Sequence, residues 1–220
     1  GGVVYINGTN AVLDNLSCIY SFATNGGAFY LNGNNATIFN TKVSFNNATD
    51  YGGAIYVAGD FALIDNSNFT KCIVYQYDGG AIYAEGLNAT ILNSYFGENR
   101  VIGNKARGGS MFIQGDYLSL EGCTFNRCTS YEGGVIYING SNARIEDSSN
   151  TFSLAQSGSA IYVAGNNVTI CHFNSSYANS TLKGGSIYIE GNDSNIFNSN
   201  FLRVYSLLGG AIYISGDNAI

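Results

Sequence analysis

Apolar and polar positions alternate along this chain in a pattern that restarts at regular intervals. The clearest copy is residues 52–59, with the sequence GGAIYVAG, in which apolar side chains lie between glycines. The frame recurs along the whole chain, and its copies are 25 to 29 residues apart; they begin at Gly1, Gly26, Gly52, Gly79, Gly108, Gly133, Gly158, Gly184 and Gly209. A period of roughly 20–50 residues is typical of a repeat architecture in which each unit stacks on the next.

Each repeat contains three short apolar segments. Counting the first glycine as position 0, positions 3 and 5 are apolar, position 4 is aromatic and position 7 is glycine in every copy. A second segment centres on position 12, and a third centres on position 17, where Phe69, Phe96 and Phe125 occur. These segments are rich in β-branched and aromatic residues and are separated by Gly and Asn. They therefore predict three short β-strands in each repeat.

A single repeat of this kind cannot bury its own apolar face, whereas repeats stacked in register can. Equivalent strands would then pair in parallel at about 4.8 Å. The pattern predicts an all-β fold, a right-handed parallel β-helix (a three-sided β-solenoid) with about 25–27 residues per coil and nine coil starts. Because the pattern is already running at Gly1 and still running at Ile220, we expect residues 1–220 to be a single β-solenoid segment of a longer protein.

The first strand of each coil presents two different faces, since successive side chains in a strand point to opposite sides. We expect the aliphatic positions 3 and 5 to face inward, which leaves the aromatic residues of position 4 outside. In the alternative, alanine at position 2 and tyrosine at position 4 fill the core, and each hydroxyl needs a buried partner. The first arrangement predicts an exposed ligand-contact column formed by Tyr30, Tyr56, Tyr83, Tyr137, Tyr162 and Tyr188.

Several polar positions also repeat. Asparagine dominates position 14, which predicts a hydrogen-bonded ladder at a turn, and His172 replaces an asparagine of this ladder in a structural role. At position 19, Glu98 follows Lys71 and precedes Arg127 in successive coils, so we expect Glu98 to lie between two cations. In two coils the phenylalanine of the third segment lies two positions later, at Phe45 and Phe152, and a two-residue shift keeps a side chain on the same face of a strand.

The longest repeat begins at Gly79, and its additional residues lie around 100–107. This stretch contains Arg100, Lys105 and Arg107, and insertions in solenoids often form binding loops on the surface. The stretch is thus a candidate binding loop. The alternative is a tolerated loop with solvated charges.

Composition and charge exclude several functions. Charged residues make up 11% of the chain and the formal net charge is -6, which gives no footprint for nucleic acid or for anionic lipid. No apolar run approaches the ~20 residues of a membrane span. The spacing of the five cysteines matches no zinc or redox motif, so we interpret them as buried free thiols.

Catalytic chemistry has little support in the sequence. Asp60, Asp116 and Asp217 share position 8 but never in adjacent coils, whereas the carboxylates of a polysaccharide-cleaving enzyme must be paired or clustered. Glu121 and Glu146 are adjacent at position 13, and with one histidine in the chain we expect no Ser-His-Asp arrangement. We expect no catalytic residue, no cofactor and no metal, and a polysaccharide-active enzyme is the third alternative.

The frame GGAI at residues 79–82, followed by FGEN at residues 96–99, resembles repeats of the polymorphic outer-membrane proteins of chlamydiae. It is more similar to the adhesin-like surface proteins of methanogenic archaea. The resemblance covers the whole chain, although Phe69 and Phe125 are followed three places on by Cys72 and Cys128 rather than by asparagine. It implies a right-handed β-helix on a cell surface that acts in adhesion, and it implies no catalytic residues.

The sequence therefore predicts an extracellular, non-catalytic adhesin or stalk segment on a cell surface. Its expected partners are neighbouring coils of the same parent chain, glycans or proteins on a host or partner cell, and further copies of itself. The alternative is a structural spacer or a protomer of a filament or sheath. Eleven Asn-x-Ser/Thr sequons fit an exterior location, although a repeat rich in these residues also creates them by register; they begin at Asn7, Asn15, Asn35, Asn47, Asn68, Asn88, Asn139, Asn167, Asn174, Asn179 and Asn192.

Overall fold

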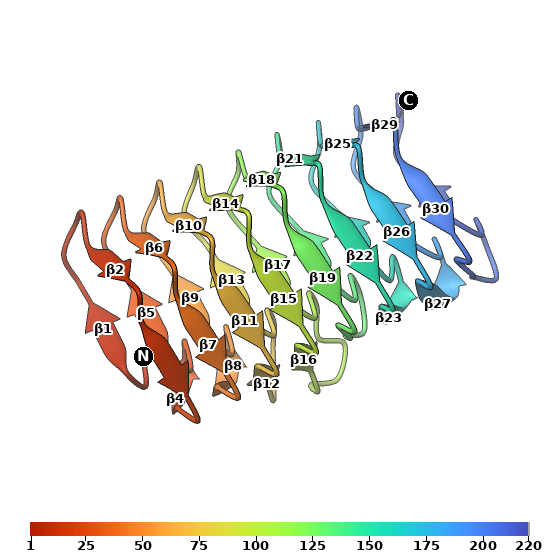
Figure 1. Ribbon diagram of the computed structural model, residues 1–220. Coiled ribbons are helices and arrows are strands. Elements are labelled where there is room, and N and C mark those ends of the chain that lie inside the picture. Colours follow the sequence, from red (N-terminus) through yellow and green to blue (C-terminus); the bar gives the residue numbers. More distant parts are fainter. Residues whose placement is uncertain (220) are drawn as a thin grey trace.

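The computed structural model describes residues 1–219 and shows a rod of stacked coils with the two termini at opposite ends (Figure 1). Every regular element in these residues is a β-strand, and each strand pairs in parallel with its equivalents in the coils before and after it. The predicted all-β right-handed parallel β-helix is confirmed. Because residues 1–219 contain no helix, the described chain has none long and apolar enough to cross a membrane.

The first sheet contains the strand that follows the paired glycines of each coil, at positions 3 to 5. Its nine strands, in spatial order, are β1 (Val4–Ile6), β5 (Phe29–Leu31), β9 (Ile55–Val57), β13 (Ile82–Ala84), β17 (Met111–Ile113), β20 (Ile136–Ile138), β24 (Ile161–Val163), β28 (Ile187–Ile189) and β31 (Ile212–Ile214). The register places identical repeat positions side by side, as in the pairs Ile55–Ile82 and Tyr56–Tyr83.

The second sheet lies at positions 11 to 13. Its eight strands are β2 (Val12–Asp14), β6 (Thr37–Phe39), β10 (Leu63–Asp65), β14 (Thr90–Leu92), β18 (Ser119–Glu121), β21 (Arg144–Glu146), β25 (Thr169–Cys171) and β29 (Asn195–Phe197).

The third sheet lies at positions 16 to 18 and also has eight strands. They are β3 (Ser17–Ile19), β7 (Lys42–Ser44), β11 (Asn68–Thr70), β15 (Tyr95–Gly97), β19 (Thr124–Asn126), β22 (Ser149–Thr151), β26 (Asn174–Ser176) and β30 (Asn200–Leu202). Together with the first two sheets, it accounts for the three strands per coil that the sequence predicts.

A fourth, less regular ladder closes each coil before the next pair of glycines. It consists of β4 (Phe22–Asn25), β8 (Asn47–Tyr51), β12 (Ile73–Val74) and β16 (Arg100–Val101), and, further along the rod, β23 (Leu154–Ser157) and β27 (Asn179–Lys183). Single bridges at Thr129 join the two groups. The sequence does not predict this ladder, because coils of different length vary in this segment and no apolar position repeats clearly there.

The core is formed by inward-facing side chains of the first three sheets. Positions 3 and 5 of the first strand are buried in it, as at Ile55 and Val57, so the predicted inward orientation of these positions is confirmed. In the third sheet, Phe69, Phe96 and Phe125 stack inside the rod with ring centroids 5.0 and 5.2 Å apart. All five cysteines are free and buried, as expected, and burial raises the pKa of Cys72 to about 12.

The corners of the coil need left-handed backbone, which explains the asparagines. Position 14 has positive φ in each of the eight coils that reach it. Its asparagines hydrogen-bond to the coil before: the Nδ2 of Asn66 donates to the Oδ1 of Asn40 over 2.8 Å, and the Nδ2 of Asn93 donates to the Oδ1 of Asp65 over 3.0 Å. His172 occupies this position with a φ of 51° and lies 3.3 Å from the Nδ2 of Asn198, in line with the predicted structural substitution. The ladder lies at the surface of the turn.

Phe45 and Phe152 correct one expectation. They do not face inward with the other phenylalanines, but lie at a corner with φ values of 57° and 59° and exposed fractions of 37% and 43%. The strand ends one residue before them, so the two-residue alternation no longer applies. The inward positions of the same coils hold Val43 and Asn150.

Candidate functional site

The six tyrosines predicted as an exposed ligand-contact column lie outside the central core, but they are not exposed. Tyr56, Tyr83, Tyr137, Tyr162 and Tyr188 are only 6–8% exposed, and Tyr30 is half-buried. The rings stack along the rod, with centroids 4.8 Å apart for Tyr30–Tyr56 and 4.7 Å apart for Tyr137–Tyr162. The expectation of exposure is therefore wrong, because in-register stacking covers both faces of each ring.

Side chains on both flanks cover the edges of this tyrosine column. On one flank, Tyr51 lies 4.5 Å from Tyr83 between ring centroids, and Lys183 lies over Tyr213 at 4.8 Å. On the other flank, the hydroxyl of Tyr162 donates to the Oε2 of Glu190 over 2.9 Å. Burial raises the pKa of Tyr83 above its usual range. The column can offer a ligand only narrow ring edges.

The candidate binding loop does not act as one unit. Arg107 folds back over the tyrosine column and binds Asp78, with its Nη2 2.8 Å from the Oδ2 of Asp78. Lys105 is exposed, and Arg100 points outward from β16 into a different surface. The structure therefore holds Arg107 in an ion pair and places Arg100 on a different surface from Lys105. A binding role for these residues stays a prediction.

Another line of aromatic and charged side chains runs along one corner of the rod, and we name it the corner column. It contains the residue that follows the third strand of each coil, always with φ between 53° and 59°; its members are Tyr20, Phe45, Lys71, Glu98, Arg127, Phe152, Tyr177 and Arg203. Left-handed backbone ends the strand here and turns each of these side chains outward at the same corner.

Neighbouring members of the corner column contact one another along the rod. Tyr20 stacks on Phe45 at 5.0 Å and Phe152 on Tyr177 at 4.7 Å between centroids. Lys71 lies over the ring of Phe45 at 5.0 Å, and Arg203 donates from Nη1 to the hydroxyl of Tyr177 over 2.8 Å. Aromatic rings and cations are thus held in a fixed array one coil apart.

Glu98 lies between Lys71 and Arg127 in this column, as its repeat position predicts. Within residues 1–219, however, no Lys or Arg nitrogen lies within 4.0 Å of its carboxylate. The guanidinium of Arg127 instead lies 5.5 Å from the centroid of Phe152. The two cations therefore interact with rings rather than with the carboxylate, and their charges remain available.

The corner column borders an open groove against the fourth ladder. One part has a volume of about 510 Å³ and is lined by Phe45, Lys71, Ile73, Glu98, Arg100, Arg127 and Thr129. It continues into a second part of about 320 Å³ that shares Arg127 and Thr129 and adds Phe152, Leu154, Tyr177 and Asn179. Four of the nine basic residues of this acidic chain, namely Lys71, Arg100, Arg127 and Arg203, lie along this corner.

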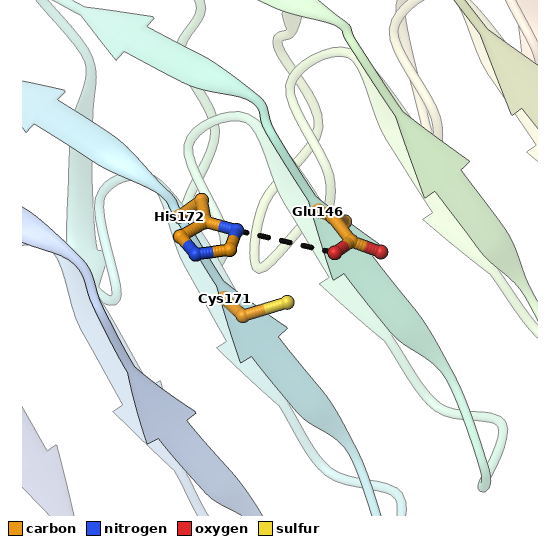
Figure 2. A group of neighbouring side chains, drawn as sticks. All are labelled: Glu146, Cys171 and His172. Carbon is orange, nitrogen blue, oxygen red and sulfur yellow. Dashed lines mark ion pairs between the residues drawn. The ribbon is translucent and has the colours of Figure 1, made fainter.

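A second cluster brings Glu146, Cys171 and His172 together on the outside of the second sheet (Figure 2). One oxygen, the Sγ and one ring nitrogen lie within 4.8 Å of one another. Glu146 ends β21, and Cys171 is its partner in β25. His172 is the next residue and lies at the left-handed corner. We expected no metal from the sequence, and these three side chains supply one oxygen, one sulfur and one nitrogen donor at the same place.

The other carboxylates singled out in the sequence bind backbone. The Oδ1 of Asp60 accepts from the N–H of Leu87 over 2.8 Å, and the Oδ1 of Asp116 accepts from the N–H of Ser141 over 2.7 Å, in each case one coil along. Asp217 lies at the equivalent turn. Glu121 and Glu146 are direct neighbours in β18 and β21, as predicted.

The sequons are spread over the surface of the rod. The side chains of Asn7, Asn15, Asn35, Asn139, Asn167, Asn174, Asn179 and Asn192 are exposed, whereas Asn47, Asn68 and Asn88 are half-buried. The amide nitrogens of Asn35 and Asn167 donate to Asn10 and Asn142 of the preceding coil, over 3.1 and 2.8 Å. Whether any sequon carries glycan stays a prediction.

Parallel coils around a continuous apolar core define the class of protein, a β-helix. The chain belongs to the right-handed beta helix region family, and the model of that family matches residues 26–202. No curated protein and no solved structure matched the chain. The family includes enzymes as well as non-enzymes, so membership alone does not assign a function to this chain.

Proposed function

We propose that this β-helix is a non-catalytic adhesin or stalk segment of a cell surface, and that it attaches through the corner column and the groove beside it. The observation that carries the proposal is the in-register array of exposed aromatic rings and cations, such as Phe45 beside Lys71 and Tyr177 beside Arg203. The resemblance of the repeat frame to adhesin-like surface proteins of methanogenic archaea supports an extracellular location.

The chemistry of the corner column suits glycan or protein surfaces. Aromatic side chains offer large rigid contact areas, and Tyr and Arg are enriched where proteins bind one another. The concentration of positive charge at one corner of a chain with net charge -6 favours ligands with negative charge. Acidic glycans or acidic protein segments on a host or partner cell are therefore the ligands we propose.

Binding can be tested without disturbing the fold, because asparagine tolerates left-handed backbone. The double substitution Phe152→Asn and Tyr177→Asn removes one exposed and one half-buried ring at positions with φ of 59° and 53°. Phe61→Asn with Tyr117→Asn is the matched control. Both residues have left-handed backbone and are 55% exposed, but they lie at another corner.

We expect saturable binding to a glycan array or to partner cells that weakens at least ~10-fold in the corner variant and is unchanged in the control, since clustered aromatic anchors dominate binding. Equal binding by the two double variants would contradict the assignment of the surface. Turnover of any polysaccharide would contradict the non-catalytic assignment. Mass spectrometry of protein produced in a glycosylating host would test the exposed sequons, such as Asn139 and Asn179.

The second candidate function is a rigid spacer or a protomer of a filament or sheath. The observation that favours it is the tyrosine column, whose rings stack along one side of the rod from Tyr5 to Tyr213. Strand edges at the ends of such a rod pair with further coils of a parent chain or with a second copy. Concentration-dependent filaments in electron micrographs, together with no binding to any cell surface, would support this candidate over adhesion.

A further inference from the structure

We propose that Glu146, Cys171 and His172 form a binding site for a zinc-like divalent cation that links two neighbouring coils. The site is independent of the proposed adhesion surface, since it lies at positions 13 and 14 of the coils that begin at Gly133 and Gly158, beside the second sheet (Figure 2).

The backbone places the three donor side chains next to one another, so no backbone movement is needed to bring them together. Parallel pairing sets Glu146 beside Cys171, and the φ of 51° at His172 turns its ring toward the same outer edge. The donor atoms lie within 4.8 Å of one another. Tetrahedral zinc ligands are separated by roughly 3.3–3.8 Å, given metal–ligand bonds of about 2.0–2.3 Å. The side chains of Glu146 and His172 are 25% and 48% exposed and can rotate. Their rotation brings the donor atoms from within 4.8 Å of one another to the separation of zinc ligands.

Cys171 differs from the other cysteines in its surroundings. Cys18, Cys72, Cys123 and Cys128 belong to the central core cluster, whereas Cys171 lies outside that cluster. Its thiol is buried beneath the outer side chains of the second sheet, next to the single histidine of the chain. It therefore forms the floor of the site, while the histidine and the carboxylate form its solvent side.

The neighbouring residues complete the site. Arg144 lies 2.6 Å from the Oε2 of Glu146, which leaves the Oε1 directed toward the Nδ1 of His172 at 3.9 Å. The Oδ1 of Asp147 lies 3.3 Å from the same nitrogen and is the nearest further oxygen ligand. The Nδ2 of Asn198 lies 3.3 Å from the Nε2. With the amide turned over, its oxygen accepts the Nε2–H of a histidine that binds the ion through Nδ1 and so orients the ring.

The donor set selects the class of ion. A thiolate, an imidazole and a carboxylate together suit borderline ions such as Zn²⁺, whereas Ca²⁺ and Mg²⁺ prefer oxygen ligands alone. Because the ligands come from two coils, an ion bound here fastens those coils to each other and stabilises the folded rod by mass action.

The experiment uses the reduced, metal-free chain, titrated with Zn²⁺ in a calorimeter and with Co²⁺ in a spectrophotometer. We expect one ion per chain, a thiolate-to-cobalt charge-transfer band, and a rise in melting temperature with Zn²⁺. Affinity should fall at least ~10-fold in Cys171→Ser and in His172→Asn, since each removes one ligand. His172→Asn restores the asparagine that other coils carry at this position, as at Asn198, so it preserves the fold.

Glu121→Gln is the matched control, because Glu121 is the direct neighbour of Glu146 in β18 but is not one of the three clustered donors. The Glu121→Gln variant should bind Zn²⁺ with the affinity of the wild type, whereas the Glu146→Gln variant should bind it more weakly. Absence of stoichiometric binding, or binding that survives both Cys171→Ser and His172→Asn, would overturn the proposal.

Discussion

Arg107 holds Asp78 of the preceding coil with three hydrogen bonds. Its Nη2 donates to the Oδ2 over 2.8 Å, and its Nε and backbone N–H donate to the Oδ1 over 3.2 and 2.8 Å. The carboxylate is only 7% exposed, and the guanidinium lies over Phe112 at 4.6 Å from the ring centroid. The pair therefore fastens the end of the longest coil onto the tyrosine column.

Breaking this pair should destabilise the rod. In Asp78→Asn, the guanidinium loses its counter-charge in a partly buried place, so we expect the free energy of unfolding to fall by ~1–3 kcal/mol. The exposed pair of Arg144 with Glu146 is the control, and Arg144→Gln should cost ~0–1 kcal/mol. Denaturant unfolding in metal-free buffer compares them; equal losses would show that Asp78 contributes no more than a surface charge.

Phe96 lies between Phe69 and Phe125 inside the rod and is fully buried. Phe96→Ala should lower the free energy of unfolding by ~3–5 kcal/mol, because it opens a cavity that flanking coils cannot close. Tyr95, the preceding residue on the opposite face of β15, is 37% exposed. Tyr95→Ala should therefore change stability by less than ~1 kcal/mol. A small effect of Phe96→Ala would mean that the core collapses around the missing ring.

Glycine at position 7 is required by the distance between coils. A Cβ on Gly140 would collide with the carbonyl oxygen of Gly115 in the preceding coil, where neither backbone can retreat. Gly140→Ala should therefore cost ~1–3 kcal/mol. A Cβ on Gly97 would meet only the mobile ring of Tyr95, so Gly97→Ala should be tolerated. Thermal unfolding of the two variants distinguishes these cases, and equal melting temperatures would contradict the argument.

The repeat pattern predicted the fold because its period reflects the stacking of one coil on the next. Residues with the same position pair with one another, and the aliphatic side chains of Ile55 and Val57 identify the inward face. The same pattern could not predict the exposure of Tyr56. Its burial depends on the stacked rings of Tyr30 and Tyr83 and on Tyr51 beside it. Tyr51 lies just before the first glycine, where residue type changes from coil to coil.

The two candidate sites were missed for different reasons. At Phe45 and Phe152, one left-handed residue interrupts the alternation on which the inward assignment relied. The signal was their place at position 19, which they share with Lys71 and Arg127. Glu146 and His172 were each noted singly, and Cys171 was grouped with the other cysteines although it shares position 13 with Glu146. Only the strand register that pairs Glu146 with Cys171 joins the three.

Tyr162 should make the stability of the rod depend on pH in the alkaline range. Burial, and next the hydrogen bond to the carboxylate of Glu190, raise the pKa of its phenol in the folded chain above its usual range. In the unfolded chain the phenol ionises near pH ~10. The stabilising contribution is therefore complete below pH ~10 and is lost as the pH rises further, because the unfolded state then releases a proton that the folded state retains.

Tyr162→Phe removes this group, so we expect the fall in the free energy of unfolding above pH ~10 to be shallower than in the wild type. Near pH ~8 the variant should lose about 0.5–1.5 kcal/mol, the contribution of one hydrogen bond. Glu190→Gln should fall between the two, because an amide still accepts the hydroxyl proton without its negative charge. Denaturant unfolding from pH ~8 to ~11.5 measures all three chains. Identical slopes would show that the tyrosine column is open to solvent and that its burial does not govern its ionisation.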